Sequence, residues 1–93
     1  MRFLMKIPIP TAAENPTVAQ PQFQDRLRAL FSGIGAQATY SSSVDGQRIE
    51  YVLVDIDVEQ ITATAEPVFR FLGVRPEFLP EVVPKPYYGR TGY

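Results

Sequence analysis

The amino-acid sequence predicts one α+β domain whose elements follow the order strand, helix, strand, strand, helix, strand. Apolar side chains alternate at residues 2–9 and 47–56, as they do in half-buried strands. In the segment that follows each of these strands, apolar side chains recur at helical spacing. An Asp45-Gly46 dipeptide between two strand-like segments is typical of a hairpin turn. The length of 93 residues suits a single small core.

The first strand is predicted at residues 2–9, where the odd positions are wholly apolar and the even positions are mixed. The N-terminal stretch MRFLMKIPIP carries two positive charges but no small-residue cleavage site, so it is not expected to be a signal peptide. The apolar stretches are far shorter than the roughly 20 residues of a membrane span. We therefore expect a cytoplasmic protein that does not associate with a membrane.

The first helix is predicted to begin at Asn15 and Pro16, because this pair is typical of a helix cap and first turn. Pro21 lacks an amide donor and is expected to break or kink the helix early. Gly33 and Gly35 are expected to end it. Its apolar face consists of Phe23, Leu27, Leu30, Phe31 and Ile34.

The next two strands are predicted to form the hairpin. Residues 36–43, AQATYSSS, are polar and suit an edge of the sheet. Residues 47–56 form the most apolar strand, with aliphatic side chains at even positions. The side chains expected to meet the helices are Phe3, Met5, Ile7, Val52, Val54 and Ile56.

The second helix is predicted near residues 58–72. Asp57 and Gln60 have the spacing of a capping box, in which each side chain bonds the backbone of the other residue. Glu59 then lies in the first turn, where the helix dipole favours a negative charge. Pro67 is expected to distort this helix, because it removes a backbone donor.

The last strand is predicted at residues 74–83, whose two prolines place it at an edge. The domain then spans residues 1–83, and residues 84–93 are expected to be an irregular tail. The order of elements is that of the ferredoxin-like, or split βαβ, arrangement. It has a four-stranded antiparallel sheet with the first and third strands in the centre and both helices on one face.

The second face of this sheet is expected to be largely apolar. With strands about 4.8 Å apart and a rise of about 3.3 Å per residue, it measures about 300 Å² in projection, near the largest apolar patch of a soluble monomer. Exposing each large side chain would forgo about 1.5–3 kcal/mol. We therefore predict a homodimer in which two sheets stack. The face is expected to carry Leu4, Ile49, Tyr51, Leu53 and Leu79, with Arg2, Lys6, Asp55, Glu77 and Glu81 among them.

Four blocks of sequence resemble a known group of proteins: MRFLMKIPIP, VDGQR, the VD that ends the third strand, and ITATAEPVF. In this order they are similar to small bacterial proteins of the dimeric α/β-barrel superfamily, near the YCII-related group. The resemblance covers residues 1 to about 84 and implies that two ferredoxin-like sheets pack into a barrel. It implies no single chemistry, since the superfamily includes cofactor-free monooxygenases, muconolactone isomerases, aromatic polyketide cyclases and haem enzymes. The histidine that YCII-related proteins pair with an aspartate is absent here.

The composition excludes several kinds of site. The chain has no cysteine and no histidine, so disulfides, thiolate metal sites and a histidine base are excluded. Nine basic and ten acidic side chains leave a formal charge of −1 without a basic patch, so nucleic acid is not an expected partner. Asp55, Asp57 and Glu59 alternate in YVLVDIDVEQ but do not match a calcium loop. We expect no metal and no cofactor.

Asp55 and Lys6 are the candidate catalytic residues. Asp55 ends the third strand, where it can form an ion pair with Arg2 at the dimer interface. Alternatively, partial burial raises the pKa of Asp55, and its carboxylate accepts a proton from an acidic carbon or phenol. Lys6 can orient an anionic or enolate oxygen, or it can form a structural salt bridge.

The candidate substrate-binding residues are Tyr40, Tyr51, Arg2 and Glu66. The tyrosine hydroxyls can donate hydrogen bonds to a ligand, although aromatic packing is the alternative. Glu66 precedes Pro67 at the expected helix distortion, and the alternative for it is an exposed helix face.

Two functions remain open from the sequence. The first is a cofactor-free enzyme, of the isomerase, cyclase or monooxygenase type, that acts on a small hydrophobic, aromatic or enolisable substrate. The second is a non-catalytic homodimer that binds a small ligand or another protein. The first rests on the resemblance and on polar groups placed on an apolar sheet, the second on the absence of histidine and cysteine.

Overall fold

The computed structural model describes residues 1–81. The predicted tail at residues 84–93 and the end of the last predicted strand lie outside this range. The elements are β1 (Arg2–Pro8), η1 (Pro16–Ala19), α1 (Phe23–Gly33), β2 (Ala38–Val44), β3 (Gln47–Asp55), η2 (Val58–Gln60), α2 (Ile61–Leu72) and β4 (Glu77–Pro80). Within the described residues, no helix combines the length and the apolar character that crossing a membrane requires.

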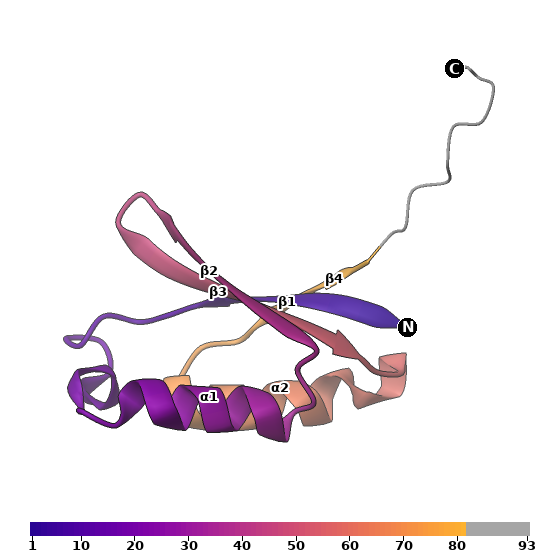
Figure 1. Ribbon diagram of the computed structural model, residues 1–93, viewed down its shortest axis with the longest axis horizontal. Helices are drawn as coiled ribbons and strands as arrows, with labels where there is room; N and C mark the ends of the chain where they lie inside the picture. The colour runs from indigo at the N-terminus through magenta and orange to yellow at the C-terminus, as the bar shows by residue number, and fades with distance from the viewer. Residues whose placement is uncertain (82–93) are drawn as a thin grey trace, which may run out of the picture.

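The four strands form one antiparallel sheet in the order β2-β3-β1-β4, and α1 and α2 lie on the same side of it (Figure 1). β1 and β3 occupy the centre, as predicted. The protein is therefore an α+β domain compatible with the ferredoxin-like fold. The start of β1 lies beside the end of β3, with Arg2 opposite Asp55 and Lys6 opposite Tyr51.

The core lies between the sheet and the two helices. The odd positions of β1 and the even positions of the second half of β3 are buried, so the predicted alternation is confirmed. The helices add side chains from their inner faces. Each large apolar side chain removed from water stabilises the fold by about 1.5–3 kcal/mol. The core consists of Phe3, Met5, Ile7, Ile9, Phe23, Leu27, Phe31, Val52, Val54, Val68 and Leu72.

The first helical segment is divided at Pro21, as its missing amide donor predicts. η1 ends at Ala19, and α1 begins at Phe23. Asn15 caps η1, because its side-chain oxygen accepts a hydrogen bond of 3.0 Å from the Thr17 N–H.

Asn15 also holds the far end of α2. Its Nδ2 donates to the carbonyl oxygens of Leu72, at 3.0 Å, and Phe71, at 3.3 Å. These carbonyls belong to the last turn of α2, where no intrahelical donor is available. One amide side chain thus caps η1 and also binds the last turn of α2, whose two carbonyls lie 56 and 57 residues from Asn15 in sequence. The Phe23 and Phe71 rings, stacked at 5.6 Å, join the same regions.

The second helix differs from its prediction. The expected Asp57–Gln60 cap forms, with the Asp57 N–H donating to Gln60 Oε1 at 2.8 Å, but it begins the short helix η2. α2 then continues from Ile61 to Leu72 with Pro67 inside it. Pro67 has no N–H for the carbonyl of Ala63. Ala63 is exposed, so water can solvate that carbonyl.

The last strand is shorter than predicted. β4 covers Glu77–Pro80 instead of beginning at residue 74. It pairs with β1 at the edge of the sheet, as expected. Pro76 precedes β4 and Pro80 ends it, and neither can donate a hydrogen bond to a neighbouring strand.

Candidate functional site

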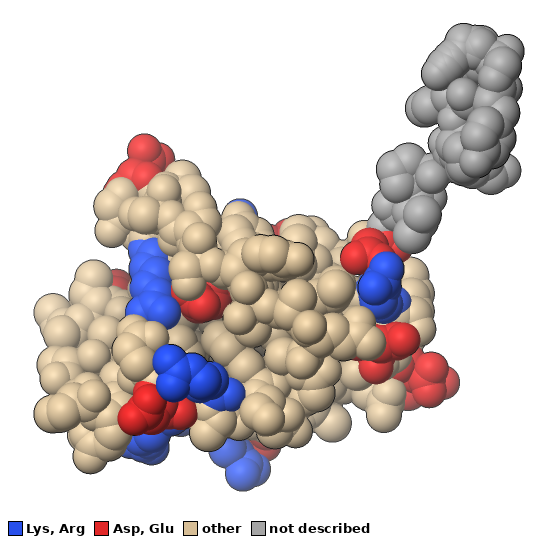
Figure 2. Space-filling model, in the orientation of Figure 1, with Lys and Arg blue, Asp and Glu red and all other residues tan. Residues whose placement is uncertain are grey.

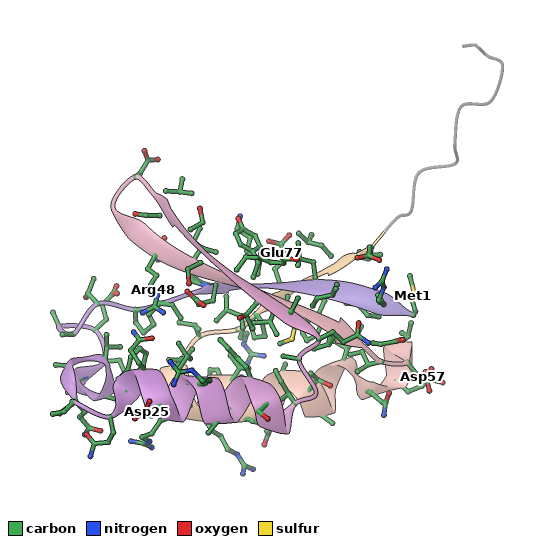
Figure 3. All side chains as sticks on the ribbon, in the orientation of Figure 1. Met1, Asp25, Arg48, Asp57 and Glu77 are labelled. Carbon is green, nitrogen blue, oxygen red and sulfur yellow. The ribbon has the colours of Figure 1, made fainter. Side chains whose placement is uncertain are left out.

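The helices of residues 1–81 leave one face of the sheet uncovered, and this face brings three of the candidate residues into one line. Tyr40, Tyr51, Lys6 and Glu77 are direct cross-strand neighbours from β2 through β3 and β1 to β4. We call these four residues the polar row. The side chains of Lys6 and Tyr51 point away from the helices. Side chains alternate along a strand, and the neighbouring positions of β1 and β3 are buried against the helices. Figure 3 shows Glu77 on the side of the sheet opposite α1 and α2.

An apolar row lies two positions along the strands from the polar row. It consists of Ala38, Leu53, Leu4 and Leu79, again direct cross-strand neighbours on all four strands. Leu4 and Leu53 are half-buried, and Leu79 is exposed. In the polar row, Tyr40 is 59% exposed, and Tyr51 and Lys6 are half-buried. This face therefore offers apolar contacts beside two phenols, an ammonium and a carboxylate.

Asp55 and Arg2 are opposite each other, but they do not form the predicted ion pair. The Asp55 carboxylate accepts from the Met1 amine at 3.0 Å, and Arg2 pairs with Glu81 (Figure 3 labels Met1). Asp55 lies at the end of β3, where its side chain is 53% exposed.

The structure separates the two candidate catalytic residues. Lys6 is four positions along β1 from the residue opposite Asp55, a distance of about 13 Å at about 3.3 Å per residue. Within one subunit, Asp55 and Lys6 therefore cannot contact the same atom of a small substrate.

Glu66 lies in the helical layer, away from the polar row. Its carboxylate accepts from Arg70 at 2.8 Å on the exposed surface of α2. It also borders an open hollow of about 360 Å³ between α2 and the segment that precedes β4. There the Arg75 guanidinium lies 5.2 Å from the centre of the Phe69 ring. The structure does not bring Glu66 together with Lys6 or the tyrosines.

A second group of polar residues lies on the helix side of the sheet and was not among the sequence candidates. Glu50 on β3 is only 4% exposed. Its Oε2 accepts a hydrogen bond of 3.0 Å from Arg48 Nε and another from the Ser41 hydroxyl. Arg48 Nη2 donates to Gln24 Oε1 on α1 at 3.2 Å.

These side chains border a cavity of about 350 Å³ between α1 and the β2-β3 hairpin, which we call the Glu50 cavity. Figure 2 shows basic and acidic side chains next to each other in the hollow between the hairpin and the helices, where Figure 3 places Arg48. The cavity is lined by Gln24, Leu27, Arg28, Phe31, Ser32, Ala36, Thr39, Ser41, Arg48 and Glu50.

One sequence signal could have indicated the Glu50 cavity. Arg48 and Glu50 occupy even positions of β3, which are the positions that Val52 and Val54 use to enter the core. Charged residues on the buried side of a strand require polar partners, because an unpaired buried charge is strongly unfavourable.

Among residues 1–81, no three acidic side chains converge in a way that could hold a metal ion. The chain matches no known protein family, no curated protein and no solved structure. Its similarity to the dimeric α/β-barrel superfamily thus stays a prediction from the sequence.

Proposed function

We propose that this protein is a homodimeric binding module for a small hydrophobic molecule, assembled by stacking of the open sheet faces as in a dimeric α/β barrel. The main support is the open face itself, where the apolar row lies beside the polar row and no helix within residues 1–81 covers either. Stacked sheets lie about 10 Å apart, so side chains from both copies would meet in one layer.

The expected dimer is of modest strength. Each open face measures only about 300 Å² in projection, so we expect an interface at the small end of the range for specific protein pairs. We therefore expect monomer and dimer to exchange at micromolar protein concentrations. Apolar contacts from Leu4, Leu53 and Leu79 would supply most of the attraction.

The ligand class follows from the polar row. Stacking would remove water from Lys6, and a buried ammonium requires an anionic or strongly polar partner. Glu77, its cross-strand neighbour, is one such partner, and an oxygen of a bound molecule is another. A small apolar molecule with an anionic or enolate oxygen would satisfy both the leucines and Lys6.

Sedimentation velocity tests the assembly. We expect the wild-type protein to form a dimer, and Leu53→Glu to be a folded monomer because it places a charge in the apolar row. Phe69→Glu is the matched control, since Phe69 is 46% exposed on α2, away from the open face. A wild-type monomer at every concentration, or dissociation by Phe69→Glu alone, would remove this assembly. A native mass spectrum of the purified dimer would show a retained ligand as extra mass.

A cofactor-free enzyme is the second candidate, because a carboxylate, an ammonium and a phenol lie in one row. Lys6 and Tyr51 could stabilise an enolate oxygen. Glu77, beside Lys6, could accept the carbon-bound proton. Asp55 could accept this proton only if it reached the site from the partner subunit.

Proton exchange with deuterated water tests this candidate without knowledge of the natural substrate. We would follow loss of the α-proton signal of 2,4-pentanedione by NMR. Acceleration by the wild-type protein that falls about a hundredfold in Lys6→Met or Glu77→Gln would support general acid–base chemistry. Asp55→Asn distinguishes the two carboxylates. A wild-type rate equal to that of buffer would leave only the binding function.

A further inference from the structure

We propose that the Glu50 cavity is a second binding site, separate from the open sheet face, and that it takes a small apolar α-amino acid. The two sites lie on opposite sides of the sheet. Glu50 and Arg48 occupy even positions of β3 and face the helices, whereas Tyr51 and Leu53 occupy odd positions and face away. Binding in the cavity therefore does not depend on the dimer.

Glu50 supplies the first part of the recognition. A carboxylate that is 4% exposed requires several hydrogen bonds, and its two oxygens offer about four acceptor positions. Both bonds that Glu50 accepts within residues 1–81, from Arg48 and Ser41, end on Oε2. Oε1 accepts none from this part of the chain, although Glu50 lines the cavity. An ammonium group of a ligand would supply the donor and compensate the charge.

Arg48 supplies the second part. A guanidinium has five N–H donors, and Arg48 uses one on Glu50 and one on Gln24. The remaining donors can bind a carboxylate in the two-pronged geometry for which arginine is suited. The Arg48 side chain is 36% exposed, so its charge is accessible from the opening of the cavity. An ammonium on Glu50 and a carboxylate on Arg48 are the two charged groups that an α-amino acid carries on one carbon atom.

The other residues that line the cavity determine the side chain and the size of the ligand. Leu27, Phe31 and Ala36 form an apolar part of the cavity, which suits an aliphatic side chain. A volume of about 350 Å³ lies at the lower end of the roughly 300–1,000 Å³ of ligand pockets, so the ligand must be small. Because the ligand is a zwitterion, it adds no net charge beside the Arg48–Glu50 pair.

Calorimetric titration of the full chain with L-leucine tests the site. Two truncated probes need no protein variant: 4-methylpentanoate lacks the ammonium, and 3-methylbutylamine lacks the carboxylate. We expect each to bind at least about tenfold more weakly than L-leucine, as the loss of one charged contact of about 1.4 kcal/mol implies. Equal binding of either truncated probe would contradict the proposed two-point recognition.

The variant Glu50→Gln keeps the shape of the side chain and removes its charge. We expect it to lose L-leucine binding by about tenfold or more, whereas Glu14→Gln, the same change at an exposed carboxylate outside the cavity, should bind as the wild type does. Thermal unfolding checks that Glu50→Gln is folded. Binding that survives in folded Glu50→Gln, or no binding of L-leucine to the wild type at millimolar concentration, would overturn the proposal. Leu53→Glu shows whether binding is independent of the dimer, and loss of binding in that variant would also contradict a separate site.

Discussion

At the scale of single residues, the side chain of Glu50 on β3 is a carboxylate that is only 4% exposed. Within residues 1–81 it is the one charged side chain that is buried, and its partners come from three places: Ser41 on β2, Arg48 on β3 and, through Arg48, Gln24 on α1. A buried carboxylate is tolerated only when its charge and hydrogen bonds are compensated. This requirement explains why Arg48 shares the helix side of β3 with Glu50, and why Ser41 on β2 faces the same carboxylate.

Removing the arginine should leave that charge uncompensated. We expect Arg48→Met to lower the free energy of unfolding by about 1–3 kcal/mol, less than for a fully buried pair because Arg48 is 36% exposed. Urea unfolding measures the change. Arg28→Met is the control, since its ion pair with Asp25 is exposed on α1 and should contribute at most about 0.5 kcal/mol. Equal effects of the two variants would show that Glu50 is solvated well enough without Arg48.

At the scale of elements, the helices depend on residues that close their ends. Gly73 follows the last residue of α2 and has a φ of 72°, in the left-handed region, and Asn15 binds the carbonyls of the last turn. These contacts are local or involve one side chain, so their contributions can be measured one at a time. The helices that these contacts hold all pack on the same core, between the sheet and the helical layer.

Gly73→Ala should destabilise the protein, because a residue with a Cβ atom is strained at positive φ. We expect a loss of about 1–2 kcal/mol in the free energy of unfolding. Gly33→Ala is the matched control, since Gly33 belongs to α1 and a Cβ atom there would meet nothing within 4 Å. It should be neutral or stabilise by up to about 1 kcal/mol. Destabilisation of similar size in both variants would argue against the conformational explanation.

Asn15 serves two helices through two different atoms, and two substitutions separate them. Asn15→Ala removes both contacts and should cost about 1–2 kcal/mol. Asn15→Asp keeps the acceptor for the Thr17 N–H but replaces the donor to Leu72 with an oxygen beside carbonyl oxygens. If the link to α2 matters, Asn15→Asp will be about as unstable as Asn15→Ala in chemical denaturation. Full stability of Asn15→Asp would assign the whole effect to the cap of η1.

At the scale of the whole molecule, the described residues cover one face of the sheet with helices and leave the other face open. The covered face holds the core, and the open face holds the apolar and polar rows. A single small core leaves a domain of this length with little stability to spare. Burial of the open face in the proposed dimer would therefore contribute to folding as well as to ligand binding.

The proposed dimer makes stability depend on protein concentration. Because dissociation accompanies unfolding, a hundredfold increase in concentration should stabilise the dimer by about 2.7 kcal/mol and raise its melting temperature by several degrees. Scanning calorimetry over that range measures the shift. Leu53→Glu should show none. A concentration-independent melting temperature for the wild type would speak for a monomer.

Sequence alone was sufficient where the structure depends on local chemistry. Alternating apolar residues identified the buried sides of β1 and β3, because a strand has a period of two. Asn15, Pro21 and the Asp57–Gln60 pair indicated helix starts and a break, since caps and missing donors act within a few residues. Asp45 and Gly46 both have positive φ, as a two-residue hairpin turn requires.

Only the tertiary structure decided which residues share a site. Ser41, Gln24 and Glu50 lie on three different elements, and no local pattern predicts that a helix will bring its glutamine to Arg48. The same is true of the separation of Asp55 from Lys6, which depends on the register between β1 and β3. It also decided that α2 continues through Pro67, because packing of Val68 and Leu72 in the core outweighs one missing hydrogen bond. Local rules determine where elements begin and which side is buried, whereas the meeting of distant side chains depends on how those elements pack.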